Sequence, residues 1–115
     1  EHSVPDHGLG QWVKTFAAAE WEFDGGPIDP ELTKTGGVGI MTAAPFAAIR
    51  YKPKGEEYAK AYELGRLAAH WVEIGSATVL CWNLYGWTGG AGCEEQAERT
   101  DDLIQIVQYE TIQNA

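Results

Sequence analysis

Apolar side chains recur with helical spacing near the start of the chain. Five of them follow one another at i, i+3, i+4, i+7 and i+8, which is the stripe of an amphipathic helix. We expect this helix to be capped by Ser3 or Asp6 and to end near Trp21, because a dense run of helix breakers follows at residues 24–27. The stripe consists of Leu9, Trp12, Val13, Phe16 and Ala17.

A second helix is predicted over residues 94–112. Leu103, Ile106, Val107 and Glu110 fall on one side of it. Three glutamates occupy its first turns, where the helix dipole favours negative charge. They are Glu94, Glu95 and Glu98.

Strands are predicted between these helices. Residues 67–74 alternate weakly between apolar and polar side chains, and residues 78–85 are rich in β-branched and aromatic side chains. Gly75 and Ser76 lie between the two segments and favour a short hairpin connection. A further short buried strand is expected over residues 37–42, ending before the proline that follows.

The remaining segments carry weaker patterns. Residues 24–37 are rich in Gly, Pro, Asp and Thr and predict a surface loop, whereas residues 46–62 show no clear period. The predicted order is therefore helix, strand, two-stranded hairpin, helix. We expect an α+β fold, part of an α/β sandwich with a mainly antiparallel sheet and flanking helices, in a single domain over residues 1–115.

Composition excludes several classes of protein. With 115 residues, of which 44% are hydrophobic and 22% charged, the chain resembles an ordinary globular domain. Seventeen acidic against eight basic residues give a net charge of −9, which disfavours a dedicated nucleic-acid or anionic-membrane binder. Cys81 and Cys93 are too few for a disulfide scaffold. The uncharged run at 74–93 is interrupted by glycines, so we expect no membrane span.

Four short motifs indicate a chemical function. In their order and spacing they resemble the endonuclease/exonuclease/phosphatase family of metal-dependent phosphodiesterases, and within it the apurinic-endonuclease-like nucleases of retrotransposons. The resemblance extends over nearly all of the chain. The motifs are Glu1-His2-Ser3-Val4, Gly36-Gly37-Val38-Gly39-Ile40-Met41 with Pro45, Asn83-Leu84-Tyr85, and Arg99 with Asp102-Leu103-Ile104.

The resemblance implies roles for three residues. Glu1, at the end of a strand, would be a ligand of Mg²⁺, Tyr85 would contact a phosphate near the scissile bond, and Asn83 would orient that site. Each residue also has a structural alternative: Glu1 as a solvated terminal side chain, Tyr85 as a core aromatic, and Asn83 as a partner of backbone groups at the strand end. The family often has an asparagine where Thr88 stands.

The same resemblance implies an incomplete site. Family members activate water with a Gly-Asp-x-Asn strand and a C-terminal Asp-His pair, and neither follows the helix predicted over residues 94–112. Hydrolysis of a phosphodiester needs a positioned base and a cation. We therefore expect an inactive middle segment of a metal-dependent phosphodiesterase-like domain. The alternative is a non-enzymatic structural or interaction subunit whose tryptophans and sheet edges bind a partner in a larger assembly.

Two further groups of side chains invite a chemical interpretation. Residues 50–66 hold five basic side chains among three tyrosines and could follow a nucleic-acid backbone, but three glutamates dilute them, so a solvated loop is favoured. The three histidines lack the spacing of a zinc site and are expected to be structural or solvated. The basic residues are Arg50, Lys52, Lys54, Lys60 and Arg66.

Overall fold

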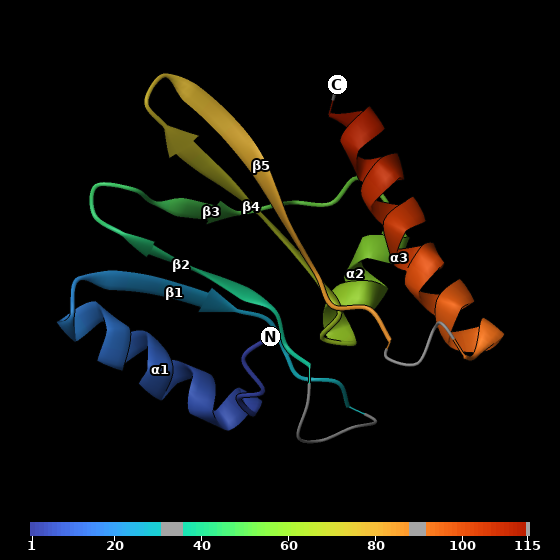
Figure 1. The fold of residues 1–115 in the computed structure, drawn as a ribbon. Coiled ribbons are helices and arrows are strands. Elements are labelled where there is room, and N and C mark those ends of the chain that lie inside the picture. The colour runs from blue at the N-terminus through green and yellow to red at the C-terminus, as the bar shows by residue number, and fades with distance from the viewer. Residues whose placement is uncertain (31–35, 88–91, 115) are drawn as a thin grey trace.

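The computed structural model describes residues 1–30, 36–87 and 92–114. It combines helices with antiparallel strands, which confirms the predicted α+β class (Figure 1). Along the chain the elements are α1 (Asp6–Ala18), β1 (Trp21–Gly25), β2 (Gly39–Ala43), β3 (Ala48–Arg50), α2 (Glu56–Glu63), β4 (Leu67–Ile74), β5 (Ala77–Leu84) and α3 (Glu94–Gln113).

The strands form two sheets. In the first, β1 pairs with β2, and Phe23 lies opposite Met41. In the second, β4 lies between β3 and β5, so that His70 of β4 faces Arg50 on one side and Cys81 on the other. All of these pairings are antiparallel, as predicted.

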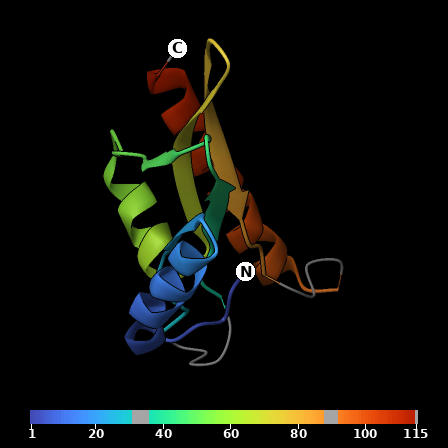
Figure 2. The ribbon, with the colours of Figure 1, turned by 90° about the vertical axis from the view of Figure 1, so that its left-hand side faces the viewer.

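Helix α1 covers one face of the first sheet. The ring of Phe23 on β1 lies 5.6 Å from the ring of Trp12 and 5.7 Å from that of Phe16, centroid to centroid. Because side chains alternate along a strand, the next residue, Asp24, points to the opposite face. There it meets His70 of the second sheet. The first sheet therefore lies between α1 and the second sheet (Figure 2).

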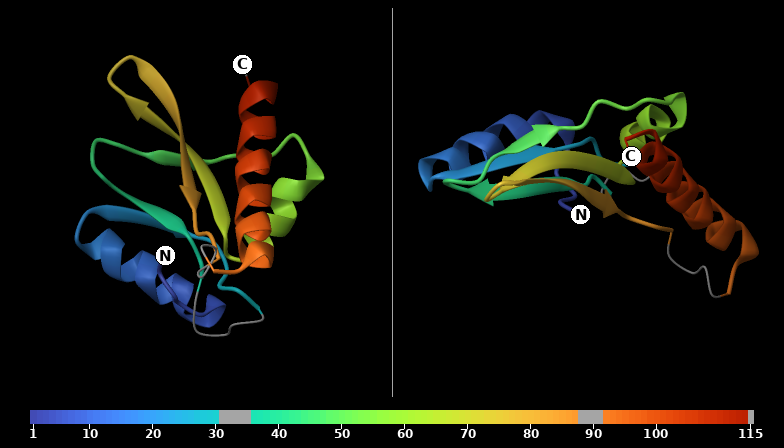
Figure 3. Two further views of the ribbon diagram at one scale, coloured as in Figure 1. Left: turned by 45° about the vertical axis from the view of Figure 1, so that its right-hand side comes forward. Right: turned by 90° about the horizontal axis from the view of Figure 1, so that it is seen from above.

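Helices α2 and α3 cover the outer face of the second sheet. Leu67 and Ala69 of β4 are fully buried there, together with Tyr58 from α2 and Leu103 from α3. Both views in Figure 3 show α2 beside α3 at this side of the molecule. The result is four layers in the order α1, first sheet, second sheet, and the pair α2 and α3.

The two sheets touch through polar contacts on their inner faces. His70 Nε2 lies 2.6 Å from Asp24 Oδ2, and the Asn83 amide donates to the Gly39 carbonyl at 2.6 Å. Away from these contacts the sheets splay apart toward the hairpin tips (Figure 1). None of the helices in the described part of the chain combines the length and apolar content needed to cross a bilayer.

Four predicted elements are confirmed, and their boundaries differ only slightly, but β2 is mostly half-buried and not the buried strand that was expected. They are α1, β2, the β4–β5 hairpin and α3. The predicted cap of α1 is wrong, because Pro5 occupies the N-cap position and no side chain caps the helix. A proline suits a helix start since its missing N–H has no partner to lose there.

Three elements, β1, β3 and α2, were not predicted from the sequence. Strand β1 occupies part of the segment read as the end of α1 and the start of a loop, and the surface-loop prediction is wrong at Asp24, which is in β1, and at Asp29, which is buried. Residues 31–35 of that predicted loop lie outside the described residues. Strand β3 and helix α2 span three and eight residues, too few for a hydrophobic period to emerge.

Candidate functional site

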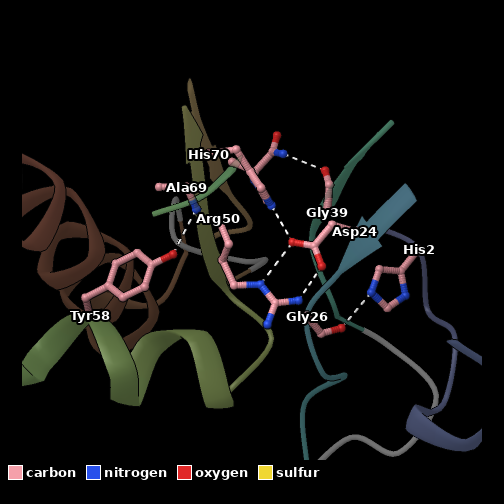
Figure 4. A network of polar contacts seen from close by, with 9 residues as sticks. His2, Asp24, Gly26, Gly39, Arg50, Tyr58, Ala69 and His70 are labelled. Carbon is pink, nitrogen blue, oxygen red and sulfur yellow. Dashed lines mark hydrogen bonds and ion pairs between the residues drawn. The ribbon is translucent and has the colours of Figure 1, made fainter. Parts of the chain in front are cut away.

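The first residues of the chain lie against the glycines that precede β2. His2 N–H donates to the Gly37 carbonyl at 2.9 Å and Ser3 N–H to the Gly36 carbonyl at 3.0 Å. Residues 1–4 nevertheless do not form the expected strand, because Ser3 has a φ of 52°, which no extended strand allows. The His2 ring bonds the Gly26 carbonyl at 2.8 Å and fixes this segment from its other side (Figure 4).

The Glu1 carboxylate is exposed and held by several donors. Its Oε1 accepts the Ser3 hydroxyl at 2.6 Å and the Gly36 N–H at 3.3 Å. The bond from Ser3, followed by the influence of the nearby Tyr85 phenol and the bond from Gly36, lowers the pKa of Glu1 below its ordinary value. The carboxylate is therefore ionised at neutral pH and oriented, as a cation ligand must be.

Tyr85 comes directly after β5 and meets Glu1. Interaction with the nearby Glu1 carboxylate raises the pKa of the Tyr85 phenol, because the negative charge favours the protonated form. The Tyr85 backbone N–H donates to the Arg66 carbonyl at 2.8 Å and so extends the β4–β5 pairing by one bond. Two residues that separate sequence motifs single out thus lie together.

Arg66 lies beneath Tyr85 and is a residue of the site that the sequence did not reveal. Its side chain is only 3% exposed and forms an ion pair of 3.0 Å with Asp29, whose side chain is also 3% exposed. The guanidinium lies 4.6 Å from the Tyr85 ring centroid and 4.5 Å from that of Trp87. The solvated loop favoured for the basic region is therefore wrong at Arg66, and it is wrong over the residues that form α2. The apolar run that begins at Leu67 was the available signal.

Asn83 points between the two sheets. Its Nδ2 donates to the carbonyl of Gly39 on β2 at 2.6 Å, and the side chain is half-buried. This bond to a backbone group is the structural role that the sequence left open for it. Thr88, where the family often has an asparagine, lies outside the described residues.

A second polar network joins the sheets around Asp24 (Figure 4). The carboxylate accepts Arg50 Nε at 3.1 Å and pairs with Arg50 Nη2, and its Oδ2 lies 2.6 Å from His70 Nε2. The bond to His70, followed by Arg50, holds the pKa of Asp24 well below its usual range. We assign this network a structural role, in agreement with the expectation for His70, because it links β1, β3 and β4.

Glu1 is the residue best suited to hold a metal ion at this site. Carboxylate oxygen is the ligand type that Mg²⁺ prefers. Across residues 1–30, 36–87 and 92–114, however, no group of three or more His, Cys, Asp or Glu side chains is placed to hold a cation. The residues of this site therefore fit a single ligand of such an ion.

The comparisons with known proteins add no relative. No family model matches the chain, and neither the curated proteins nor the solved structures gave a match. The likeness to the endonuclease/exonuclease/phosphatase family therefore rests on the sequence motifs, and its functional consequences are proposals.

Proposed function

We propose that Glu1 and Tyr85 form one wall of a site for a divalent cation and a phosphodiester. The carboxylate would supply one oxygen ligand to Mg²⁺, and the phenol would donate a hydrogen bond to a phosphoryl oxygen. The observation that supports this most is the mutual effect of these two side chains on each other's pKa, although they lie far apart in the sequence.

We further propose that this chain by itself binds the cation weakly and does not hydrolyse the ester. Mg²⁺ requires a nearly octahedral set of oxygen ligands, and one carboxylate fills a single position of it. Attack by water also needs a positioned base close to the phosphate. The chain would thus be a segment of a metal-dependent phosphodiesterase-like domain that supplies part of the site.

Paramagnetic Mn²⁺ provides a direct test of the cation site. In the NMR spectrum we expect it to broaden the Gly36 amide and the Tyr85 ring signals before other residues. Glu1→Gln should abolish this broadening, whereas Glu22→Gln, at an exposed position of β1, should leave it unchanged. Broadening that survives Glu1→Gln would overturn the proposed ligand.

A nicking assay tests the second half of the proposal. Supercoiled plasmid incubated with the chain and Mg²⁺ should remain intact. Nicking that disappears in both Glu1→Gln and Tyr85→Phe would show that the chain completes a catalytic site and would overturn the proposed inactivity.

A second candidate function is that of an interaction subunit in a larger protein assembly. Ile49 on β3 is 66% exposed and Ile112 on α3 is 69% exposed, and large exposed apolar side chains favour contact with another protein. Nucleic acid is a less favoured partner because of the net charge of −9. Concentration-dependent association in sedimentation velocity, reduced by Ile49→Asp, would support this candidate; a monomer at all concentrations would argue against self-assembly.

A further inference from the structure

We propose that Asp29 and Arg66 are positioning residues that hold Glu1 and Tyr85 in register with each other. This role rests on the function proposed above for that pair. It follows from contacts that run from the buried ion pair to both members of the site.

The contacts of Arg66 fix the end of β5. Its backbone carbonyl accepts the Tyr85 N–H at 2.8 Å, and its Nη1 donates to the Gly86 carbonyl at 3.1 Å. Its guanidinium lies against the rings of Tyr85 and Trp87, a geometry in which cation and aromatic ring attract each other. Arg66 thereby holds the Tyr85 backbone through its own carbonyl, and its side chain holds the Tyr85 ring and the Gly86 carbonyl.

Asp29 connects the same guanidinium to the segment that holds Glu1. Its carboxylate accepts Arg66 Nη2 at 3.0 Å. Its backbone N lies so close to Gly36 that a Cβ there would come within 3.0 Å of it. The Gly36 N–H in turn donates to Glu1 Oε1 at 3.3 Å. Asp29 therefore lies directly behind the backbone that orients the carboxylate.

The chemistry of the arginine matters beyond its charge. A guanidinium is planar and can stack flat on a ring while donating two hydrogen bonds in fixed directions, whereas a lysine ammonium is a compact charge that cannot stack flat and whose donors rotate. Arg66→Lys should therefore keep the charge beside Asp29 but lose the contacts with Tyr85 and Gly86. The Arg66→Lys variant therefore tests whether Arg66 positions the Tyr85 ring or only balances the charge of Asp29.

The contact itself can be measured in the absence of metal. The nuclear Overhauser cross-peak between the Tyr85 ring protons and the Glu1 side chain should be present in the unsubstituted chain and lost in Arg66→Lys, while the amide signals of β4 and β5 keep their dispersion. The matched control is Arg99→Lys, because Arg99 also stacks on Trp87 at 4.5 Å but lies on α3, and it should retain the cross-peak. A cross-peak retained in Arg66→Lys, or absent from the unsubstituted chain, would overturn the proposal.

A second variant covers the case in which Arg66→Lys does not fold. Replacing a buried ion pair by apolar side chains of similar volume is often neutral for stability, whereas removing one partner is not. We expect Asp29→Leu combined with Arg66→Met to fold and to lose the cross-peak. If this double variant folds and keeps the cross-peak, the pair does not position the site.

The outcomes separate this inference from the function on which it rests. If Mn²⁺ fails to broaden the signals at Glu1 but the cross-peak depends on Arg66, the proposed cation site fails and the positioning role stands. If Mn²⁺ binds at Glu1 in both the unsubstituted chain and Arg66→Lys, and the cross-peak persists, only the positioning role fails.

Discussion

The hydroxyl of Tyr51 donates a hydrogen bond of 2.9 Å to the carboxylate of Glu110, although one residue precedes α2 and the other lies near the end of α3. The same carboxylate accepts the backbone N–H groups of Lys54 and Gly55 at 2.6 and 3.1 Å. Glu110 is 1% exposed. It therefore serves as a buried anchor that fixes the start of α2 against α3.

Removing this anchor should destabilise the fold strongly. Glu110→Ala leaves a buried hydroxyl and two backbone N–H groups without their acceptor, and we expect the free energy of unfolding to fall by about 3 kcal/mol. Glu98→Ala, at an exposed position of the same helix, should change it by less than about 0.5 kcal/mol. Urea denaturation of both variants measures the difference. Equal stabilities would show that the three bonds contribute little.

The Asp24 network should make stability depend on pH in the acidic range. Since the pKa of Asp24 is depressed in the folded state, the unfolded chain takes up the proton first as pH falls. Its contribution is complete above about pH 5 and declines as pH falls below about 4, the pKa of an unfolded aspartate.

We therefore expect Asp24→Asn to lower the free energy of unfolding by about 1 kcal/mol at about pH 5, a modest value because the Asp24 side chain is 35% exposed. The difference in free energy of unfolding between the two chains should be smaller at about pH 3, where the Asp24 carboxylate of the unsubstituted chain contributes less. Denaturant titrations at both pH values give the measurement. A difference in free energy of unfolding that is the same at both pH values would contradict the contact between Asp24 and His70.

Two glycines should respond in opposite directions to the same substitution. Gly65 has a φ of +71°, and a Cβ there would come within 2.5 Å of the Pro27 carbonyl oxygen and 2.7 Å of the Gly37 nitrogen. Gly65→Ala should therefore lower the free energy of unfolding by about 2 kcal/mol or more. Gly10→Ala, inside α1 with open space around it, should raise it by about 0.5 to 1 kcal/mol.

Thermal and urea unfolding of these two variants give the comparison. A Gly65→Ala chain as stable as the unsubstituted one would show that the backbone of Pro27 and Gly37 leaves room for a Cβ at residue 65.

The core should be centred on β4. Leu67 is completely buried between the second sheet and its helices, so Leu67→Ala should lower the free energy of unfolding by about 3 kcal/mol through lost contacts and a cavity. Ile112→Ala, at a highly exposed site of α3, should have an effect below about 0.5 kcal/mol. Comparable losses in the two variants, measured by urea denaturation, would place the core elsewhere.

Long periodic segments were predictable because their pattern is local. The side of α3 that the spacing selected is the side that is buried, with Leu103 and Glu110 at its centre, and Ile104 beside them is exposed. The β4–β5 hairpin followed from β-branched and aromatic runs around Gly75 and Ser76. Such patterns record which face of a single element avoids water.

Short elements were not predictable in this way. In β1 a single side chain, Phe23, is buried, and in α2 the two buried residues are Tyr58 and Ala61. Their secondary structure depends on partners that come from other parts of the chain: β2 for the first, and β4 and α3 for the second. No window of a few residues contains that information.

The sequence by itself determined the class of fold, the two long helices and the hairpin, and it singled out Glu1 and Tyr85 as chemically interesting residues. Only the tertiary structure brought those two side chains near enough to shift each other's pKa, turned Asn83 toward the Gly39 carbonyl, and buried Arg66 against Asp29. The physical reason is that periodicity reports the burial of one face of one element, whereas hydrogen bonds and ion pairs between distant residues exist only after the sheets and helices have packed.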